Sequence, residues 1–511
     1  MSITLRKFVD RLPKMSTIKP KHKDDKGAYY EVRMTQFMQR LHRDMRPTML
    51  WGYNGQFPGP LFDVKQGEPI QVKWMNDLPS RHILPVDLSL HGLAELPEVR
   101  TVTHLHGGVT QASSDGYPDA WFTRGFEKVG PDYEQEIYHY PNNQPAAALW
   151  YHDHAMGITR LNMYAGLAGM YIIRDEAEKT LYLPEGKYEL PLIVQDRSFK
   201  PDGSLDYPRQ PDDPEEGWPD PSVVPFFLGD TILVNGKVWP YAEVEPRKYR
   251  LRILNASNTR AYALYLDSED YFYQIGTDGG LMQRTTKAKK IPMEPAERVD
   301  LIVDFTGLQG KTITLKNDLG PNADPEDRTN DIMQFRVNQP LAGKDNSNIP
   351  RKLIEIPSLK KNKVQTIRDL KLVGTTDELG RPLLLLNNKK WMDEVTEKPR
   401  LGDTEIWSFK NLTTFTHPIH IHLVRFQVLD HRPFDLDAFN ETGILTFTGP
   451  ATRPKSNELG WKDTIAVPSA TITRVIAHFV PYAGEYVWHC HILEHEDYDM
   501  MRPFTIVDPE S

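Results

Sequence analysis

The sequence predicts an all-β protein made of several domains, and three observations support this. Its 511 residues exceed the size of one ordinary domain and indicate two to four. Turn signals such as Asn54-Gly55 and Asn235-Gly236 recur along a chain that contains 41 prolines. Between the turns lie short alternating runs, for example at 69–74 and 298–305. Many short, turn-bounded strands without long amphipathic helices are typical of β-sandwiches and β-barrels.

The domain boundaries are predicted from changes in local composition. A strand-like run at 169–174 precedes a charged connection at 175–186, which ends a first domain at 1–176. A stretch rich in Lys, Pro, Ser and Asn has little periodicity and predicts a linker at 341–365. We therefore expect β domains at 1–176, 177–340 and 366–511.

Charge and hydropathy exclude two classes of partner. The net charge of −9 disfavours a general nucleic-acid-binding role. No apolar run approaches the roughly 18 residues that a membrane-spanning helix needs, and the N-terminus lacks a signal-peptide pattern. We expect a protein that is made in the cytoplasm without a signal peptide and has no nucleic-acid or membrane partner.

The chain contains one cysteine, Cys490, so an intramolecular disulfide is excluded. By residue type alone, such a thiol is a buried small hydrophobe, a nucleophile or a metal ligand, and the buried hydrophobe is the commonest case. The neighbouring residues favour the metal ligand, as the histidine pattern shows.

Ten of the 17 histidines fall in four tight groups. Each group contains a His-x-His step, and residues i and i+2 of a strand point to the same face. Imidazole suits copper, zinc, nickel and iron. One such pair is weak evidence, but four pairs in one chain predict a metal centre formed by the first and last domains. The groups are His104 and His106; His152 and His154; His417, His420 and His422; and His489, His491 and His495.

The last group also contains the cysteine. If the strand is extended, Cys490 faces away from His489 and His491, so its thiolate can bind a second metal on the other side. His417, His495 and Met500 complete a set of two His, one Cys and one Met, which is the ligand set of a blue-copper site. Structural zinc sites favour more thiolates. For Met500 a core position is the alternative, since Met501 adjoins it.

The four motifs resemble those of the multicopper oxidase family, and nearly the whole chain is similar to the laccases of the bacterial endospore coat. The resemblance implies three cupredoxin-like Greek-key β-barrels and four copper ions. Where the last domain has Cys490, the first has Asp153, so the first domain would lack a blue-copper site. Members of this group can carry a disulfide in the middle region, which this chain cannot form. The implied ligands are His104 and His420 for the type 2 copper; His106, His152, His154, His422, His489 and His491 for the type 3 pair; and His417, Cys490, His495 and Met500 for the type 1 copper.

The implied activity is one-electron oxidation of a small aromatic substrate, a phenol, an aromatic amine or bilirubin, coupled to reduction of dioxygen to water. Asp115 and Glu496 resemble the acidic residues that supply protons at the cluster, although Ser114-Asp115-Gly116 would also suit a surface turn. Asp153 is a candidate partner of a metal-bound histidine or an exposed strand residue. A cuprous or ferrous oxidase, and a structural coat protein with incidental oxidase activity, remain alternatives. The resemblance also implies a spore-coat location and other coat proteins as partners.

Overall fold

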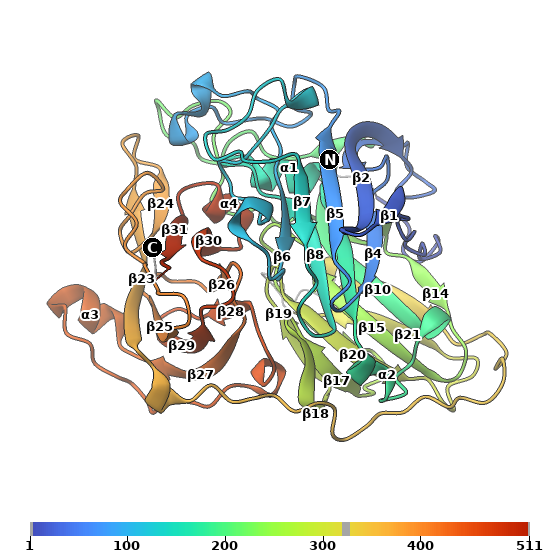
Figure 1. Ribbon diagram of the computed structural model, residues 1–511. Helices are drawn as coiled ribbons and strands as arrows, with labels where there is room; N and C mark the ends of the chain where they lie inside the picture. Colours follow the sequence, from blue (N-terminus) through green and yellow to red (C-terminus); the bar gives the residue numbers. More distant parts are fainter. Residues whose placement is uncertain (1–3, 319–327, 509–511) are drawn as a thin grey trace.

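The computed structural model describes residues 4–318 and 328–508, without the side chains of residues 92–94. Within these ranges six β-sheets form three pairs along the chain, as predicted for an all-β protein. In Figure 1 the first pair lies at the upper right in blue and teal, the middle pair below it in green and yellow, and the third at the left in orange and red.

The first sheet pair contains the strands between residues 22 and 174. Its mixed pairings include β2 with β5 and β4 with β9 in parallel. One sheet has the order β1 (His22–Asp24), β2 (Gly27–Gln39), β5 (Ile70–Asn76), β7 (Ile137–Tyr140), with β3 (Thr48–Tyr53) paired to β2. The other has the order β4 (Gly59–Lys65), β9 (Ala168–Arg174), β8 (Ala147–Asp153), β6 (Thr103–His106).

The middle sheet pair contains the strands between residues 189 and 336. Its larger sheet has the order β13 (Lys237–Val238), β12 (Thr231–Val234), β10 (Glu189–Phe199), β15 (Lys248–Asn255), β20 (Arg298–Asp304), β17 (Phe272–Thr277), β18 (Gly280–Ala288), with β11 (Leu205–Asp206) on β10. The smaller has the order β14 (Tyr241–Glu243), β22 (Asp331–Arg336), β21 (Thr312–Asn317), β16 (Tyr262–Leu266), β19 (Lys290–Met293).

The third sheet pair contains the strands between residues 366 and 506. One sheet has the order β24 (Pro382–Leu386), β23 (Thr366–Thr376), β25 (Thr404–Asn411), β29 (Thr471–His478), β27 (Phe426–Pro433). The other has the order β28 (Thr464–Val467), β26 (His417–Ile421), β30 (Gly484–Cys490), β31 (Met501–Ile506).

The helices of the described residues are short, so strands form the framework. The α-helices are α1 (Thr159–Ala165), α2 (Glu176–Lys179), α3 (Leu436–Thr442) and α4 (Leu493–Glu496). The 3-10 helices are η1 (Leu90–Glu95), η2 (Ala112–Ser114), η3 (Arg124–Phe126), η4 (Gly186–Tyr188), η5 (Arg328–Asn330), η6 (Lys361–Lys363) and η7 (Ser456–Glu458). None of the helices in the described ranges is long and apolar enough to cross a membrane.

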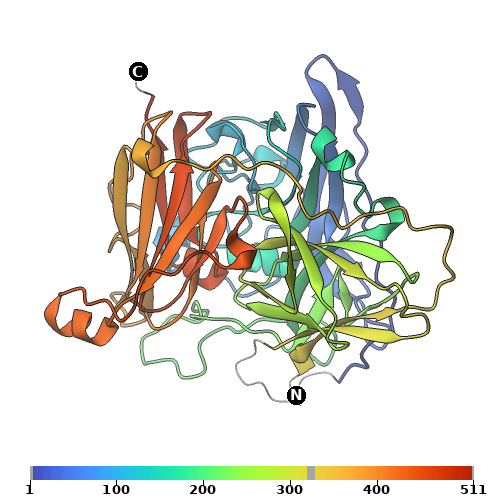
Figure 2. The ribbon, with the colours of Figure 1, turned by 90° about the horizontal axis from the view of Figure 1, so that it is seen from below.

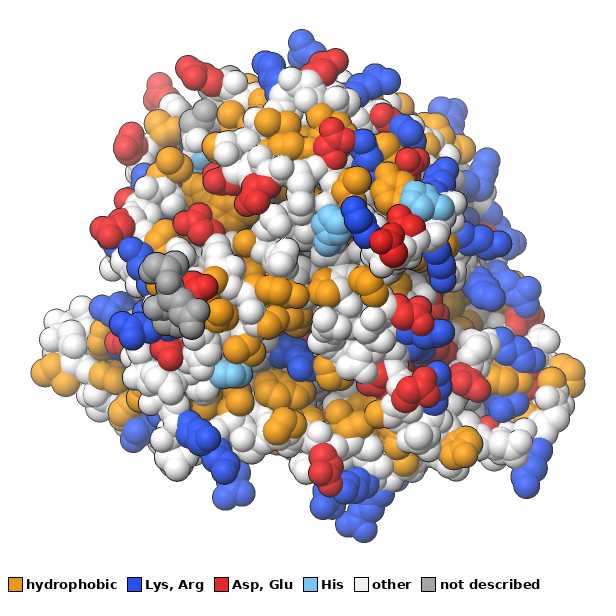
Figure 3. Space-filling model, in the orientation of Figure 1, with side chains coloured by type: hydrophobic (Ala, Val, Ile, Leu, Met, Phe, Trp, Pro, Cys, Tyr) orange, Lys and Arg blue, Asp and Glu red, His pale blue; other side chains and the backbone are white. Residues whose placement is uncertain are grey.

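The linker predicted at 341–365 forms no named strand and contains only η6. Figure 2 shows it running across the surface from the middle sheet pair to the third. No sheet crosses the predicted boundaries, and we propose to keep the division into 1–176, 177–340 and 366–511. On the face in Figure 3, acidic, basic and apolar side chains are interspersed, as in an ordinary solvent-exposed surface.

The apolar cores show how the three pairs associate. The first and middle pairs share one buried cluster that includes Trp74, Leu149 and Leu301. The third pair has a cluster of its own, and Cys490 and Met500 belong to it. The predicted blue-copper residues therefore lie within the core of the third pair, where rigid packing fixes their positions.

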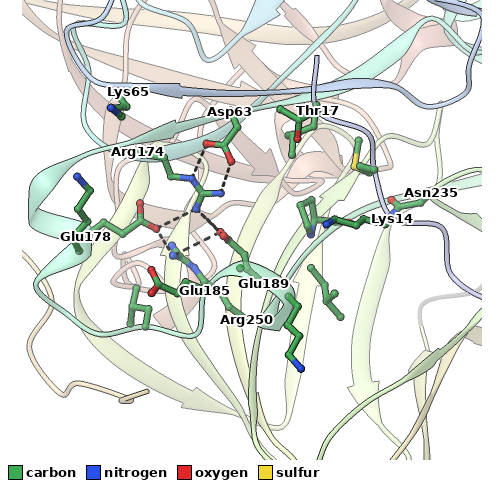
Figure 4. A pocket seen from close by; sticks show the side chains of 18 of the residues that line it. Lys14, Thr17, Asp63, Lys65, Arg174, Glu178, Glu185, Glu189, Asn235 and Arg250 are labelled. Carbon is green, nitrogen blue, oxygen red and sulfur yellow. Dashed lines mark hydrogen bonds and ion pairs between the residues drawn. The ribbon is translucent and has the colours of Figure 1, made fainter. Parts of the chain in front are cut away.

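A partly buried ion-pair network also joins the first and middle pairs, beside a pocket of 1510 Å³ that the N-terminal segment helps to line. Figure 4 shows Arg174 of β9 between Asp63 and Glu189, with Arg250 of β15 close to Glu178 and Glu189. Arg174 lies 2.7 Å from Glu189 and 3.0 Å from Asp63. Buried charges need such partners, because an unpaired charge away from water is costly.

Candidate metal centre

Hydrogen-bond register brings the predicted histidines together. In the first pair, His104 of β6 lies directly opposite His152 of β8. In the third pair, His420 of β26 lies opposite His489 of β30. Because i and i+2 share a face, each of these cross-strand matches also places a second histidine on the same side. The two pairs face each other, so that the two halves of the cluster come from residues more than 300 positions apart.

The imidazole rings of the two halves are in direct contact. His104 stacks on His422 with ring centroids 3.8 Å apart, and His106 stacks on His420 at 3.6 Å. His489 Nε2 lies 3.3 Å from the Nε2 atoms of both His154 and His422. The cluster residues are buried; they are His104, His106, His152, His154, His420, His422, His489 and His491.

Several combinations of these side chains could hold a metal ion, with donor atoms within 4.8 Å of one another. They are His104, His106 and His152; His104, His420 and His422; His154, His422 and His489; and His106, His420 and Asp463. Among the described residues, none of these groups includes His491. Its ring centroid lies 5.1 Å from that of His106 and 5.4 Å from that of His152.

The surroundings hold most of these rings in place. His104 Nδ1 donates to the Asp115 carbonyl at 2.6 Å, and His422 Nδ1 donates to the Asp115 carboxylate at 2.7 Å. His152 Nδ1 donates to the Asp153 carbonyl at 2.8 Å. His420 Nδ1 donates to the Asp463 carbonyl at 2.8 Å. Such hydrogen bonds fix the tautomer and leave the other nitrogen free to bind a metal.

The second group lies on the other side of the strand that carries Cys490. Cys490 Sγ is 3.4 Å from His417 Nδ1 and 3.7 Å from His495 Nδ1. His417 Nε2 lies 2.8 Å from Thr413 Oγ1, and the Ile492 amide donates to the sulfur. Met500 is buried in the same apolar cluster, and its carbonyl accepts from the Cys490 amide at 3.0 Å.

Glu496 of α4 lies beside the histidine cluster. Its Oε2 is 3.0 Å from His489 Nδ1, and its Oε1 is 3.5 Å from His154 Nδ1. Burial raises the pKa of the Glu496 carboxyl, and His489 opposes this shift. Burial also raises the pKa of the Asp115 carboxyl well above its usual range. In both groups burial favours the protonated carboxyl beside the cluster.

The structure decides between the two expected roles of Asp153 and adds two residues that were missed. Asp153 is fully buried, so it is not an exposed strand residue. Its carbonyl is the partner of His152, while its carboxylate accepts from Val102 N, Ala155 N and Asn162. Asp463 contacts His106 and was not predicted, because no motif marks it. Arg298, which lies in the middle sheet pair, binds Asp463. It was missed because no copper ligand is predicted in that part of the chain.

The comparisons with known proteins cover nearly the whole chain. Profiles described as multicopper oxidase match residues 36–178 and 358–510. The laccase of Bacillus subtilis is 57% identical over 99% of this chain and 100% of its own length. The laccase of Bacillus stratosphericus is 53% identical with the same coverage. The chain belongs to the multicopper oxidase family.

Solved structures agree with this assignment. A laccase from Pediococcus acidilactici has a TM-score of 0.78 at 28% identity, with 99% of this chain and 95% of that chain covered. A multicopper oxidase from the hyperthermophile Aquifex aeolicus has a TM-score of 0.76 at 26% identity, with 99% and 100% covered. The predicted cupredoxin-like fold class is confirmed. This multicopper oxidase is an oxidoreductase of the laccase type, as predicted, and its cofactor is copper.

The donor atoms fit copper by their own chemistry. Burial and mutual repulsion lower the pKa of His104, His154 and His422, which favours the neutral imidazole that a metal ligand requires. Burial raises the pKa of the Cys490 thiol, and a bound cation would favour the thiolate. Several buried ring nitrogens of the multicopper oxidase have no hydrogen-bond partner among the described residues: His104 Nε2, His106 Nδ1, His152 Nε2, His154 Nδ1, His420 Nε2, and Nδ1 and Nε2 of His491.

Proposed function

We propose that this laccase-type oxidase holds four copper ions and couples oxidation of small aromatic substrates to reduction of dioxygen. The observation that carries this proposal is the position of Cys490 between two donor groups. Its sulfur faces His417 and His495, while the preceding His489 belongs to the histidine cluster. When bound, copper would supply one-electron oxidation of the substrate and four-electron reduction of dioxygen to water.

The proposed ligands follow the two donor groups. His417, Cys490 and His495 would hold the type 1 ion, with Met500 as a weak axial ligand. His104 and His420 would hold the type 2 ion. The type 3 pair would be held by His106, His152, His154, His422, His489 and His491.

The chain itself connects the two groups. Cys490 is bonded through one peptide unit to His489 and through the next to His491. His489 Nδ1 also donates to the Cys490 carbonyl at 3.0 Å. Electrons therefore have a short and continuous covalent path from the Cys490 sulfur to the histidine cluster, with no need for movement of the protein.

Two carboxyl groups would supply protons on opposite sides of the cluster. Glu496 reaches His489 and His154, whereas Asp115 reaches His422 and, through its carbonyl, His104. Reduction of dioxygen to water consumes protons, and burial favours the protonated form of both carboxyl groups, which would deliver protons to the cluster.

Metal analysis and substrate comparison test the proposal. We expect about four copper ions per fully loaded chain, because the donors divide into one mononuclear and one trinuclear set. Phenol, bilirubin and cuprous ion should then be compared by steady-state rates, with the phenol or bilirubin oxidised faster than the metal ion. One or two copper ions per chain, mostly zinc, or a preference for cuprous ion would contradict the proposal.

The resemblance to laccases of the endospore coat leads us to propose the same location, with other coat proteins as partners. Fractionation of spores from the source organism, followed by immunodetection, would test this. Recovery of the chain only outside the coat fraction would contradict it.

A further inference from the structure

Aromatic side chains pack against the two histidines of the type 1 group. The Phe226 ring lies 4.8 Å from the His495 ring and 4.9 Å from Phe415, measured between centroids. Phe226 is 39% exposed and the nearby Leu228 is 43% exposed. His495 Nε2 is buried near the Pro225 backbone and makes no hydrogen bond of ordinary length. If an aromatic substrate packs on Phe226, only the Phe226 ring therefore separates it from His495, a proposed type 1 ligand.

The segment that leads to Phe226 is strongly acidic. Residues 209–220 contain five carboxylates and one guanidinium, and the only ion pair that this segment forms with described residues joins Arg209 to Asp220. The unpaired acids are exposed: Asp212, Asp213, Glu215 and Glu216. In Figure 2 this part of the chain is a green loop without helix or strand that extends beneath the third sheet pair.

Contacts hold the acidic segment against the third sheet pair. Trp218 Nε1 donates to the Leu379 carbonyl at 3.0 Å, and Glu215 lies against Gly380. The adjoining Asp377 accepts from the Tyr498 hydroxyl at 2.5 Å, three residues beyond His495. Leu379 is 44% exposed, so an apolar surface and unpaired carboxylates occur together.

We infer that the acidic segment 209–220 selects positively charged aromatic amines as reducing substrates at the Phe226 entrance. This inference rests on the proposed function. The ring of such a substrate packs on Phe226 and Phe415, while its ammonium group is attracted by the neighbouring carboxylates. Unpaired exposed carboxylates raise the local concentration of cations and repel anions, and salt weakens both effects.

A series of catechols that differ only in charge tests the inference. Dopamine is cationic, methylcatechol is neutral and dihydroxyphenylacetate is anionic at neutral pH. The test variant combines Asp212→Asn, Asp213→Asn, Glu215→Gln and Glu216→Gln. At low salt we expect kcat/KM to fall about fivefold for dopamine, to rise about fivefold for dihydroxyphenylacetate and to stay constant for methylcatechol. High salt should abolish these differences.

A matched control separates local from overall charge. It combines Asp24→Asn, Asp25→Asn, Glu176→Gln and Glu269→Gln, which change the net charge equally on exposed sites of the first and middle sheet pairs. This control should leave the three rates unchanged. Equal changes for all three catechols in the test variant, or the same pattern in the control, would overturn the inference.

Binding to the copper-free protein gives a readout that needs no turnover. Phenethylamine and phenylacetate are redox-inert and carry opposite charges. By NMR titration, phenethylamine should bind the wild type more tightly than phenylacetate, and its Kd should rise about fivefold in the test variant only. Equal binding of the two ligands would refute the charge selection. If the copper-loaded wild-type protein oxidises none of the three catechols, the proposed function itself is refuted.

Discussion

Arg298 and Asp463 form a buried ion pair that joins the middle sheet pair to the histidine cluster. Arg298 of β20 donates from Nη1 to Asp463 Oδ1 at 2.8 Å and from Nε to the Ala148 carbonyl at 3.1 Å. The same Asp463 oxygen lies 3.2 Å from His106 Nε2. Arg298 thus belongs to the sheet pair that has no proposed copper ligand, yet it contacts both of the other sheet pairs. It also positions the Asp463 carboxylate beside the cluster.

Asp463→Asn should weaken copper retention at the cluster. The amide preserves the size of the side chain but removes the carboxylate that Arg298 binds directly, so that Asp278 at 3.9 Å remains as its acidic partner. A buried charge left with no partner typically costs about 3–5 kcal/mol, and we expect a smaller loss here because Asp278 remains. We expect a lower thermal unfolding temperature and fewer copper ions per chain, with the blue absorption retained. Asp430→Asn, which breaks an ion pair with Arg474 elsewhere in the third sheet pair, is the control. Full copper content at wild-type stability would show that Asp463 has no positioning role.

Cys490→Ser should abolish the blue absorption and nearly all substrate oxidation. The hydroxyl is a poor replacement for a thiolate ligand, whereas the buried volume hardly changes, so the loss of stability should be limited to about 1–3 kcal/mol. Absorption spectra of the copper-loaded variant and circular dichroism would measure both effects. A persistent blue band would mean that another residue provides the sulfur or the charge transfer.

The sequence predicts the part of this centre that depends on local geometry. His104 and His106 are two residues apart on one strand, and strand alternation alone places both rings on one face. Asp463 and Arg298 could not be predicted in this way, since 165 positions separate them and only the packing of different sheet pairs brings them together. Asp115 illustrates the intermediate case: its Ser-Asp-Gly context also fits a surface turn, but packing against His422 buries it.

The β-strands are predicted well because they also follow from local sequence patterns. The alternating run at 298–305 becomes β20, and the turn at Asn235-Gly236 joins β12 to β13. For Asp153 two roles stayed open, because strand alternation shows only that its side chain faces away from His152. The structure buries Asp153, and its carbonyl accepts from His152 Nδ1 at 2.8 Å. Which groups lie on that face depends on α1, where Asn162 donates to the Asp153 carboxylate at 2.7 Å.

Glu496→Gln should slow dioxygen reduction while the substrate still reduces the blue site. The amide retains contacts near His489 but cannot carry a proton, and general acid catalysis of this kind contributes about 100-fold or more. Oxygen consumption across pH and anaerobic bleaching of the blue band would separate the two half-reactions. Unchanged oxygen consumption at every pH would exclude Glu496 as the proton carrier.

Glu189→Gln should weaken the junction of the first and middle sheet pairs at neutral pH. Burial alone would raise the pKa of Glu189, but Arg252, Arg250 and Arg174 outweigh it and hold that pKa below its usual range. The stabilisation is therefore present above the unfolded-state pKa of about 4.3 and is lost as the pH falls toward the lower folded-state pKa. We expect a loss of about 3 kcal/mol at pH 7 that shrinks in acid. Thermal unfolding at several pH values measures it, and a difference independent of pH would refute the assignment.

Met500→Leu should raise the reduction potential of the type 1 site without removing its colour. A thioether donates weakly to copper and favours the oxidised ion over an aliphatic neighbour, and the axial ligand is a known determinant of blue-copper potentials. Leucine is close to methionine in volume, so repacking in the core of the third sheet pair should cost less than about 1.5 kcal/mol. The blue band should persist because Cys490, His417 and His495 remain.

Met501→Leu is the matched control, since Met501 is also buried but belongs to a different apolar cluster. A redox titration decides: an unchanged potential in the Met500 variant would place this side chain in the core only, and a rise in the Met501 variant would make Met501 the axial ligand.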